Sequence, residues 1–426
     1  MSVIPPYLLP DNAAIAADGR LSIGGCDVLE LAAEYGTPLF IYDEHHLRAR
    51  CREAVAAFGD GVAYATKAFL CTAMAQLAHE EGMQLDVATG GELHVALHAG
   101  VPGDRLVMHG NNKSEAELRM ALEASVGRIV VDSFDEFDRI EALVAAGLPA
   151  PTVLIRVNPG VDAHTHEYLQ TGVPDSKFGF GVGDGAADRA VDRAHQSHAM
   201  HLAGIHAHIG SQVFVVDSFV KAVGALAPLV TRIRADEFSI GGGLGVPYVE
   251  GESAPTITEW ADAVKGACAG AGIQSRILAE PGRAIVARAA ITAYRVGTIK
   301  PIDGVRTYVS VDGGMSDNPR PVLYGSGYEA FLPRSVGAER PNRVRIVGKH
   351  CESGDVIVQD ARVPADLTVG DVLATPVTGA YGHTMGSNYN MVLRPPVVFA
   401  RTGSARLVVR RETFSDLVAR DVAEME

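Results

Sequence analysis

Lys67 lies near the end of a short, mostly apolar segment, Tyr64-Ala65-Thr66-Lys67-Ala68. Its side-chain amine is a group that could form a covalent bond with a ligand. A charged ammonium is costly to bury at the inner end of such a segment. Two interpretations follow. Either the side chain extends to the surface, or its amine has a lowered pKa and forms a Schiff base with a carbonyl ligand. The lysine alone does not decide between them.

A second set of polar side chains lies in residues 206–212, a segment with two histidines and a serine. His206 and His208 are two residues apart, so a strand would present both on the same face. Such a pair could bind a metal ion if further ligands came from other strand ends, and His164 and His166 follow another predicted strand. Alternatively, one imidazole stacks against a planar cofactor while Ser211 binds an anion.

Two glycine-containing segments complete the set of candidate functional residues. In 241–245, the glycines let backbone N–H groups approach a phosphate closely, which makes Gly242 and Gly243 candidate phosphate ligands. Glu280-Pro281-Gly282-Arg283 offers either a surface ion pair or a carboxylate that keeps a pyridine nitrogen protonated, with Gly282 beside the phosphate. An amine, a stacking surface, a phosphate site and such a carboxylate are together what pyridoxal 5′-phosphate requires.

These groups need elements that bring them together, and the sequence predicts strands that alternate with helices. The predicted strands are 62–67, 84–88, 105–109, 128–132, 152–158, 202–208, 238–242 and 276–280. Stretches with helical spacing of apolar residues lie between them, at 92–99, 115–124, 135–146, 186–197, 219–234 and 258–269. Eight such units favour an α/β fold, a (β/α)8 TIM-like barrel with its reacting groups at the carboxyl ends of the strands. An open doubly wound sheet is the alternative.

The pattern changes after about residue 290. Strands separated by Gly, Pro and Asp turns are predicted at 290–299, 307–312, 343–351, 355–359, 372–376, 392–400 and 404–410, before a helix at 414–424. This indicates a C-terminal all-β domain, against which the first 35 residues can pack. We therefore expect a barrel domain over 36–290 and a β domain made of 1–35 and 291–426.

Composition narrows the class of protein. The chain has 426 residues, enough for two domains, and a formal net charge of −14, which argues against nucleic acid or an anionic membrane as the main partner. Its five cysteines are an odd number without a CxxC pair, which fits a reducing compartment. The sequence contains neither a signal-like N-terminal segment nor a run of membrane-spanning length. We expect a soluble cytoplasmic protein.

These motifs together resemble the barrel-type pyridoxal-phosphate-dependent decarboxylases of the alanine-racemase-like fold, and most of all their diaminopimelate decarboxylase branch. The resemblance runs from Tyr35 to Asn390. It implies pyridoxal 5′-phosphate as cofactor and assigns the cofactor lysine, ring-stacking, phosphate and ring-nitrogen roles to the motifs above. The cofactor-binding residues that it implies are Lys67, His208, Ser211, Gly242, Gly243, Glu280, Gly282, Arg283 and Tyr381.

The resemblance extends to substrate binding and catalysis in the β domain. It implies that Arg320 and Tyr324 bind the substrate together with Arg283 and Tyr381. It further implies that the loop around Cys351 comes from the neighbouring subunit of a homodimer, with Cys351 as proton donor and Glu352 at the distal amine. The implied reaction is decarboxylation of meso-2,6-diaminopimelate to L-lysine, the last step of bacterial lysine biosynthesis.

Other functions stay open on the sequence alone. A decarboxylase of another amino acid or of carboxynorspermidine would keep the cofactor residues and change the residues that bind the distal end of the substrate. A racemase would lack the long match in the β domain. A metal-dependent barrel hydrolase would use His206 and His208 as ligands, although we expect no metal. A catalytically inactive regulator is disfavoured because Lys67 and Cys351 are both present.

Overall fold

A computed structural model describes residues 3–160 and 176–422. The chain forms two compact units. One consists of Arg48–Val246 and Ser253–Ile285, and the other of Met1–Leu47, Pro247–Glu252 and Val286–Glu426. Each unit is described by itself below. In the part of the chain that the structure describes, no helix combines the length and the apolar character needed to cross a membrane.

The first unit contains a sheet of eight parallel strands in the order β13-β12-β11-β9-β8-β7-β6-β5, with the short β10 (Phe180–Gly181) beside β9. The strands are β5 (Ala63–Ala65), β6 (Gln84–Val87), β7 (Leu106–Met108), β8 (Arg128–Val131), β9 (Thr152–Asn158), β11 (His201–His206), β12 (Glu237–Ser239) and β13 (Arg276–Leu278).

The two outer strands of this order also meet each other. Val62 pairs with Ala279 in parallel register, and the Ala63 N–H donates to the Ala279 carbonyl at 2.9 Å. The Ala65 N–H donates to the Pro281 carbonyl at 3.2 Å. The sheet is therefore closed, so the predicted (β/α)8 barrel is confirmed and the open doubly wound sheet is not.

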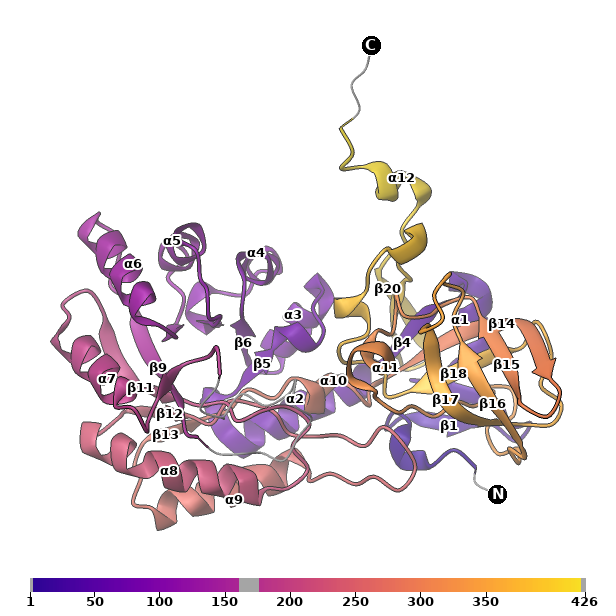
Figure 1. Ribbon diagram of the computed structural model, residues 1–426, viewed down its shortest axis with the longest axis horizontal. Helices are drawn as coiled ribbons and strands as arrows, with labels where there is room; N and C mark the ends of the chain where they lie inside the picture. The colour runs from indigo at the N-terminus through magenta and orange to yellow at the C-terminus, as the bar shows by residue number, and fades with distance from the viewer. Residues whose placement is uncertain (1–2, 161–175, 423–426) are drawn as a thin grey trace. The chain divides into compact units, whose positions relative to one another are not determined.

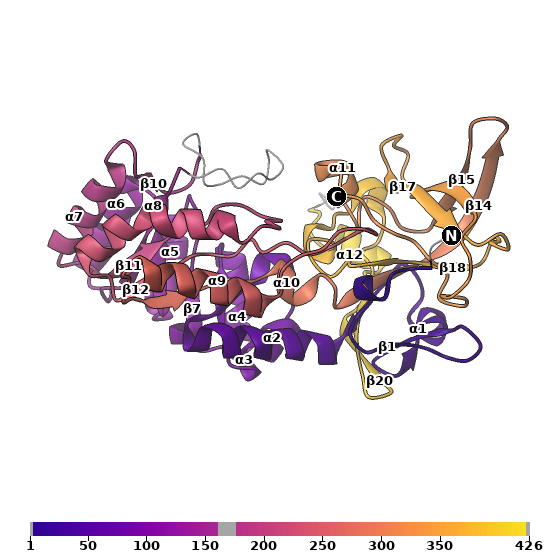
Figure 2. The same cartoon turned by 90° about the horizontal axis from the view of Figure 1, so that it is seen from below.

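Helices cover the outside of the barrel (Figure 1). They are α3 (Thr72–Glu80), α4 (Gly90–His98), α5 (Glu115–Glu123), α6 (Phe134–Ala145), α7 (Ala186–Gln196), α8 (Asp217–Ile233) and α9 (Ile257–Gly270). The last two lie side by side in both views (Figure 2). Side chains supplied by the strands fill the interior, among them Ala63, Val107, Val130, Leu154 and Leu278. At the amino ends of the strands, Arg128 of β8 and Glu237 of β12 form a buried ion pair that covers this end of the barrel interior with polar groups.

The second unit is built on a mixed sheet in the order β17-β16-β15-β14-β4-β19-β20, with β18 also paired to β14. Its strands are β4 (Leu39–Asp43), β14 (Ala290–Ile302), β15 (Arg306–Val311), β16 (Asn342–Val347), β17 (Val356–Val363), β18 (Val372–Pro376), β19 (Val397–Arg401) and β20 (Ser404–Val409). A small sheet of β1 (Ala13–Ile15), β2 (Leu21–Ile23) and β3 (Cys26–Asp27) leads into α1 (Val28–Tyr35).

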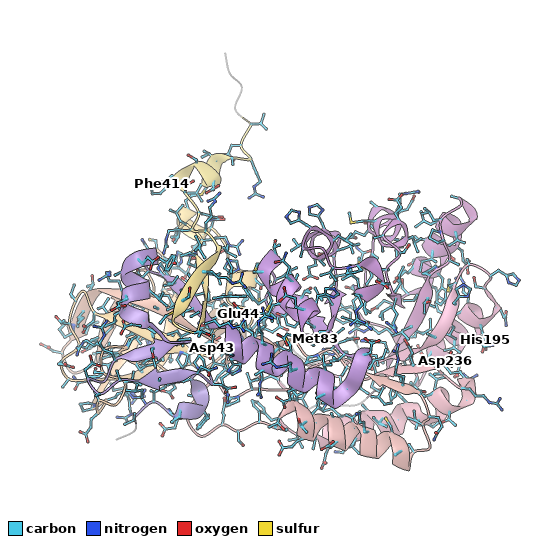
Figure 3. All side chains as sticks on the ribbon, turned by 180° about the vertical axis from the view of Figure 1, so that it is seen from behind. Asp43, Glu44, Met83, His195, Asp236 and Phe414 are labelled. Atoms are coloured by element: carbon cyan, nitrogen blue, oxygen red, sulfur yellow. The ribbon has the colours of Figure 1, made fainter. Side chains whose placement is uncertain are left out.

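β4 shows where the structure differs from the expected division of the chain. The sequence boundary at residue 36 placed this segment with the barrel, but β4 pairs with β14 and β19 in the mixed sheet. Asp43 ends β4 and Glu44 begins α2 (Glu44–Phe58), as the labels in Figure 3 show. All five residues of β4 are buried. A fully buried strand has the same apolar composition in either sheet, so its pairing partners alone decide where it belongs.

Several predicted ends were wrong for local reasons. The strand predicted over 62–67 ends at Ala65, and Lys67 lies in the 3-10 turn Thr66–Ala68. The strand predicted over 392–400 begins only at Val397, because Pro395 and Pro396 have no N–H to donate. The helix predicted over 414–424 is α12 (Phe414–Val418), with residues 423–424 outside the described part of the chain. Phe414 and Val418 are exposed, so no packing extends this helix.

Candidate active site

The carboxyl ends of the barrel strands bring together ionisable side chains from six segments. Lys67 follows β5, Asp86 lies in β6, His109 follows β7, Arg156 lies in β9, His206 ends β11 and Glu280 follows β13. All except Lys67 are buried. Lys67 is exposed between the buried Thr66 and Ala68 because the 3-10 turn carries it out of the strand. Its amine is therefore accessible to a ligand at this end of the barrel.

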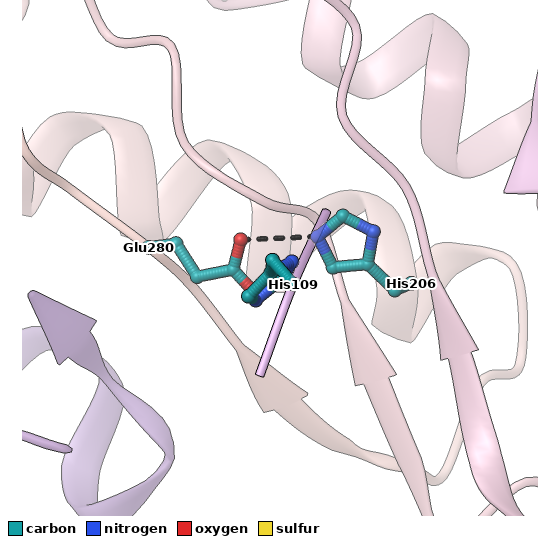
Figure 4. Close-up of side chains that lie close together, drawn as sticks. All are labelled: His109, His206 and Glu280. Carbon is teal, nitrogen blue, oxygen red and sulfur yellow. Dashed lines mark hydrogen bonds and ion pairs between the residues drawn. The ribbon is translucent and has the colours of Figure 1, made fainter. Parts of the chain in front are cut away.

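Glu280 is held by side chains on both of its carboxylate oxygens. Figure 4 shows it beside His206 and His109. His206 Nε2 lies 3.0 Å from Oε2, and the Ser239 hydroxyl donates to Oε1 at 2.9 Å. His109 Nε2 lies 3.4 Å from Oε1 and 3.6 Å from Asp86 Oδ1. The two imidazole rings meet edge to face, with centroids 4.9 Å apart. The carboxylate has little freedom to rotate.

Two neighbouring histidines keep Glu280 ionised although it is buried. Burial alone would raise its pKa, but His206 and His109 outweigh burial and hold the pKa well below its usual range. Burial likewise raises the pKa of the neighbouring Asp86, and the negative charge of Glu280 raises it further. An ionised carboxylate fixed at a barrel mouth is what a protonated ring nitrogen would need.

His208 lies beside a glycine loop that has no room for side chains. The Gly242 N–H donates to His208 Nδ1 at 3.1 Å. A Cβ on Gly242 would lie 2.2 Å from the Glu280 carbonyl oxygen, and a Cβ on Gly243 would lie 2.1 Å from the Gly210 carbonyl oxygen. Burial first, and then the charge of Lys67, lowers the pKa of His208 well below its usual value. This imidazole is neutral and can offer a flat face to a ring.

A cation and a hydroxyl meet next to this loop. Arg283 begins α10 (Arg283–Val286), and its Nη2 donates to the Ser211 hydroxyl at 3.0 Å. A Cβ on Gly282 would lie 2.9 Å from the Ala65 Cβ, so only glycine lets the chain pass so close to β5. The predicted phosphate residues Ser211, Gly242, Gly243 and Gly282 therefore occupy neighbouring segments at one end of the barrel, with Arg283 beside them.

Apart from Arg283, the predicted substrate residues lie in the second unit. Arg320 begins α11 (Arg320–Tyr324) and is buried, with its guanidinium 3.9 Å from the centre of the Tyr248 ring. Its Nη1 donates to the Tyr328 hydroxyl at 2.7 Å. Burial opposes the charge of Arg320, but Tyr248, Tyr328 and Tyr381 outweigh it and raise the pKa. Nε of Arg320 and both amide atoms of Asn318 are buried without a hydrogen-bond partner among the described residues.

Cys351 and Glu352 are exposed on a loop of the same unit. Asp355 holds the base of this loop, since its carboxylate accepts from the His350 N–H at 2.9 Å and from the Met315 N–H at 2.6 Å. The Cys351 N–H donates to the side-chain oxygen of Asn390 at 3.0 Å. The thiol is thus presented on a fixed backbone rather than on a loose loop.

The structure places His206, rather than the pair His206 and His208, in a group whose geometry could hold an ion, together with His109 and Glu280. His206 faces Glu280, whereas His208 accepts from the backbone of Gly242. His164 and His166, the other ligands considered for that hypothesis, lie outside the described residues.

Sequence reasoning missed His109, Asp86 and Ser239. His109 and Asp86 belong to predicted strands whose carboxyl ends reach the same barrel mouth, so the rule that found Lys67 and Glu280 also applies to them. A single histidine or aspartate at a strand end is too common to draw notice without a partner in space.

Comparisons with known proteins agree with this geometry. Residues 44–287 match the family described as "Pyridoxal-dependent decarboxylase, pyridoxal binding domain". The chain is 46% identical to the diaminopimelate decarboxylase of Mycobacterium tuberculosis, over 98% of both chains, and 46% identical to that of Bacillus subtilis, over 95% of both. The solved diaminopimelate decarboxylase of M. jannaschii, in co-complex with L-lysine, superposes with a TM-score of 0.91 at 32% identity, covering 97% of this chain and 98% of that one.

This chain belongs to the diaminopimelate decarboxylase family of pyridoxal-dependent decarboxylases. Its cofactor is therefore pyridoxal 5′-phosphate, and the residues at the barrel mouth fit that molecule. An accessible amine, a neutral imidazole face, a glycine loop and an ionised carboxylate are the four groups that the cofactor needs.

Proposed function

We propose that this chain catalyses the decarboxylation of meso-2,6-diaminopimelate to L-lysine, with Lys67 as the residue that binds pyridoxal 5′-phosphate covalently. The observation that carries the proposal is the buried, ionised Glu280 at the same barrel mouth as the accessible amine of Lys67. The proposed substrate is inferred from the relatives, which are named diaminopimelate decarboxylase. When bound, the cofactor accepts the electron pair that departing carbon dioxide leaves on the reacting carbon.

The chain's own residues divide the remaining work. Glu280 keeps the proton on the cofactor's ring nitrogen, His208 stacks on the ring, and Ser211 with the glycine loop binds the phosphate. Lys67 is regained when product leaves. Cys351 gives a proton to the reacting carbon, so one carbon–carbon bond is replaced by one carbon–hydrogen bond. The thiolate then recovers a proton from water.

The far end of the substrate carries both a carboxylate and an ammonium. Arg320 and Arg283 suit the carboxylate because a guanidinium donates two parallel hydrogen bonds. Glu352 suits the ammonium, and Tyr324 and Tyr381 line the same site. Arg320 already has its guanidinium fixed against two tyrosine rings, so little rotamer freedom is lost when substrate binds.

We further propose a cytoplasmic homodimer in which the Cys351 loop completes the neighbouring subunit's site. The exposure of Cys351 and Glu352 supports this, because a proton donor that faces solvent in one chain needs a second surface to exclude water. The absence of disulfides among the five cysteines, all of which the structure describes, suits the cytoplasm, and the net charge of −14 suits a small-molecule rather than a nucleic-acid partner.

Carbon dioxide release from a panel of amino acids tests the proposed function. The panel contains meso-diaminopimelate, lysine, ornithine, arginine and carboxynorspermidine. We expect turnover of diaminopimelate only, and an absorbance band of the bound cofactor that borohydride removes and Lys67→Ala lacks. Faster turnover of another member would replace the substrate and keep the chemistry. Colourless protein that contains a bound metal would instead favour a hydrolase.

A further inference from the structure

Glu280 has two histidine neighbours that none of the roles above uses. His206 and His109 approach different oxygens of the carboxylate, and both are buried. Their surroundings differ, and this difference gives the two imidazole rings different protonation states.

His206 behaves as a neutral donor. Its Nε2 faces Glu280 Oε2 at 3.0 Å, whereas its Nδ1 is buried and meets no hydrogen-bond partner in the described chain. Burial lowers the pKa of His206 to about 4, with Glu280 acting in the opposite direction. A neutral ring has one proton, and it belongs on Nε2 because only that nitrogen faces an acceptor.

His109 is placed to carry a full positive charge. Its Nε2 lies between two carboxylates, 3.4 Å from Glu280 and 3.6 Å from Asp86. Burial alone would lower the pKa of His109, but Asp86 and Glu280 outweigh burial and raise it. A cation at this point also compensates the charge of both acids in a region closed to water.

We propose that His109 and His206 are positioning residues for the ring-nitrogen carboxylate with separate tasks: His206 fixes one oxygen as a neutral donor, and His109 supplies the charge that keeps Glu280 ionised. The inference rests on the proposed function, because it concerns the acid that would face the cofactor's ring nitrogen.

The other groups around Glu280 do not replace these tasks. Ser239 of β12 donates a hydrogen bond but has no charge. Asp86 of β6 is itself an acid, and Lys67 acts on it from η3 (Thr66–Ala68). Arg156 of β9 is a nearby cation, but its Nη1 already lies 3.4 Å from Asp132, and its guanidinium lies 4.2 Å from the centre of the Phe178 ring. Without His109, only the uncharged donors His206 and Ser239 would oppose the burial that favours a neutral Glu280.

Substitution by glutamine separates the two tasks, since glutamine keeps an N–H donor and removes the possibility of charge. Affinity for pyridoxal 5′-phosphate is measured by adding it to apoprotein between pH 6 and 8. His206→Gln should bind close to wild type, whereas His206→Leu should bind about tenfold more weakly. His109→Gln should also bind about tenfold more weakly, and more so as the pH falls, because its Glu280 then takes up a proton.

The control variant is His98→Gln, which changes an exposed histidine on α4 and should bind like wild type. Equal behaviour of the two glutamine variants would overturn the division of tasks. Wild-type affinity and a flat pH profile in His109→Gln would remove the charge role.

Nuclear magnetic resonance of apoprotein with ¹⁵N-labelled histidine tests the same inference without the cofactor. Signals are assigned by their loss in the variants. We expect His109 to be doubly protonated at pH 7 and His206 to be neutral with its proton on Nε2. A neutral His109 or a charged His206 would refute the inference. Failure of wild-type apoprotein to bind the cofactor would instead refute the proposed function and leave this result valid.

Discussion

Burial raises the pKa of acids in this molecule, and the groups that face each acid decide whether that rise is overcome. Glu280 stays ionised because two histidines contact its oxygens. Asp317 is equally enclosed, but within the described residues its carboxylate accepts from two neutral donors, the Tyr294 hydroxyl at 2.6 Å and the Gly314 N–H at 2.8 Å. Burial raises the pKa of Asp317 to about 7 because neutral donors do not outweigh the loss of water. A carboxyl group with such a pKa makes folding depend on pH.

The sign of this dependence is fixed by the direction of the shift. The pKa of Asp317 is higher in the folded chain than its ordinary 3.8, so the folded state binds the proton more tightly. Its stabilising contribution is complete below about pH 4 and is lost as the pH rises through 7. At about 1.4 kcal/mol per pKa unit, the loss is on the order of 4 kcal/mol.

Asp317→Asn should remove this dependence, because an amide resembles the protonated acid. We expect the urea midpoints of the variant and of wild type to agree near pH 4.5, and the variant to become the more stable protein near pH 8. Parallel midpoints across this range would show that Asp317 is ionised in the folded chain. Asp303→Asn serves as a control, since Asp303 is an exposed carboxylate in the turn between β14 and β15.

Sequence reasoning found the residues whose neighbours in the chain form a pattern. Lys67, the two histidines of 206–208 and Glu280 each lie in a recognisable motif at a predicted strand end. His109 and Asp86 do not, since their partners come from other strands and meet them only once the barrel closes. The pKa of each acid depends on those partners, so the local sequence carries little information about it.

At the scale of elements, the glycine loop after β12 depends on two separate properties of glycine. Gly243 has a φ of +106°, and a Cβ there would lie 2.1 Å from the Gly210 carbonyl oxygen. Gly272, just after α9, has a φ of +73° but has open space where a Cβ would be. At both positions a residue other than glycine would strain the backbone, but only at Gly243 would its Cβ also collide with a neighbouring atom.

Gly243→Ala should therefore weaken cofactor binding well beyond the effect of Gly272→Ala. The Gly272 variant should lose only about 1 kcal/mol of stability from backbone strain and bind the cofactor normally. The Gly243 variant must move the loop or the Gly210 segment, and we expect at least about tenfold weaker binding of pyridoxal 5′-phosphate to the folded apoprotein. Circular dichroism checks folding, and absorbance titration measures binding. Equal affinities would mean that this loop does not contact the phosphate.

The same scale explains which elements could be predicted. Eight barrel strands were found because each is a short apolar run followed by a helical pattern. β4 fell on the wrong side of the domain boundary predicted at residue 36, because its partners β14 and β19 are more than 240 residues away along the chain. Pairing over such a distance leaves no local signal.

At the scale of the whole molecule, the proposed reaction divides its residues between the two units. Lys67 and Glu280 belong to the barrel unit, whereas Cys351 and Glu352 belong to the β unit. If the Cys351 loop completes the site of a neighbouring subunit, a chain without its lysine can still supply a thiol to its partner. A chain with a defective barrel unit and a chain with a defective β unit can then together form one working site.

Lys67→Ala and Cys351→Ala should each be nearly inactive alone, the second while still binding the cofactor. Coexpressed in equal amounts, they should recover about a quarter of wild-type activity. Random pairing makes half of the dimers mixed, and each mixed dimer has one intact site of two. Steady-state turnover of the purified mixture measures this recovery. The mixed dimer, isolated with two affinity tags, should show about half of wild-type activity because one of its two sites is intact.

A pair of variants within one unit provides the matched control. Lys67→Ala with Glu280→Ala should show no recovery, because both side chains come from the same barrel and every mixed site lacks one of them. Recovery by the first pair alone requires that the thiol and the lysine of a working site come from different chains. Absence of recovery in isolated mixed dimers would mean that each chain uses its own Cys351, and the exposed loop would then have to reach the barrel mouth of its own chain.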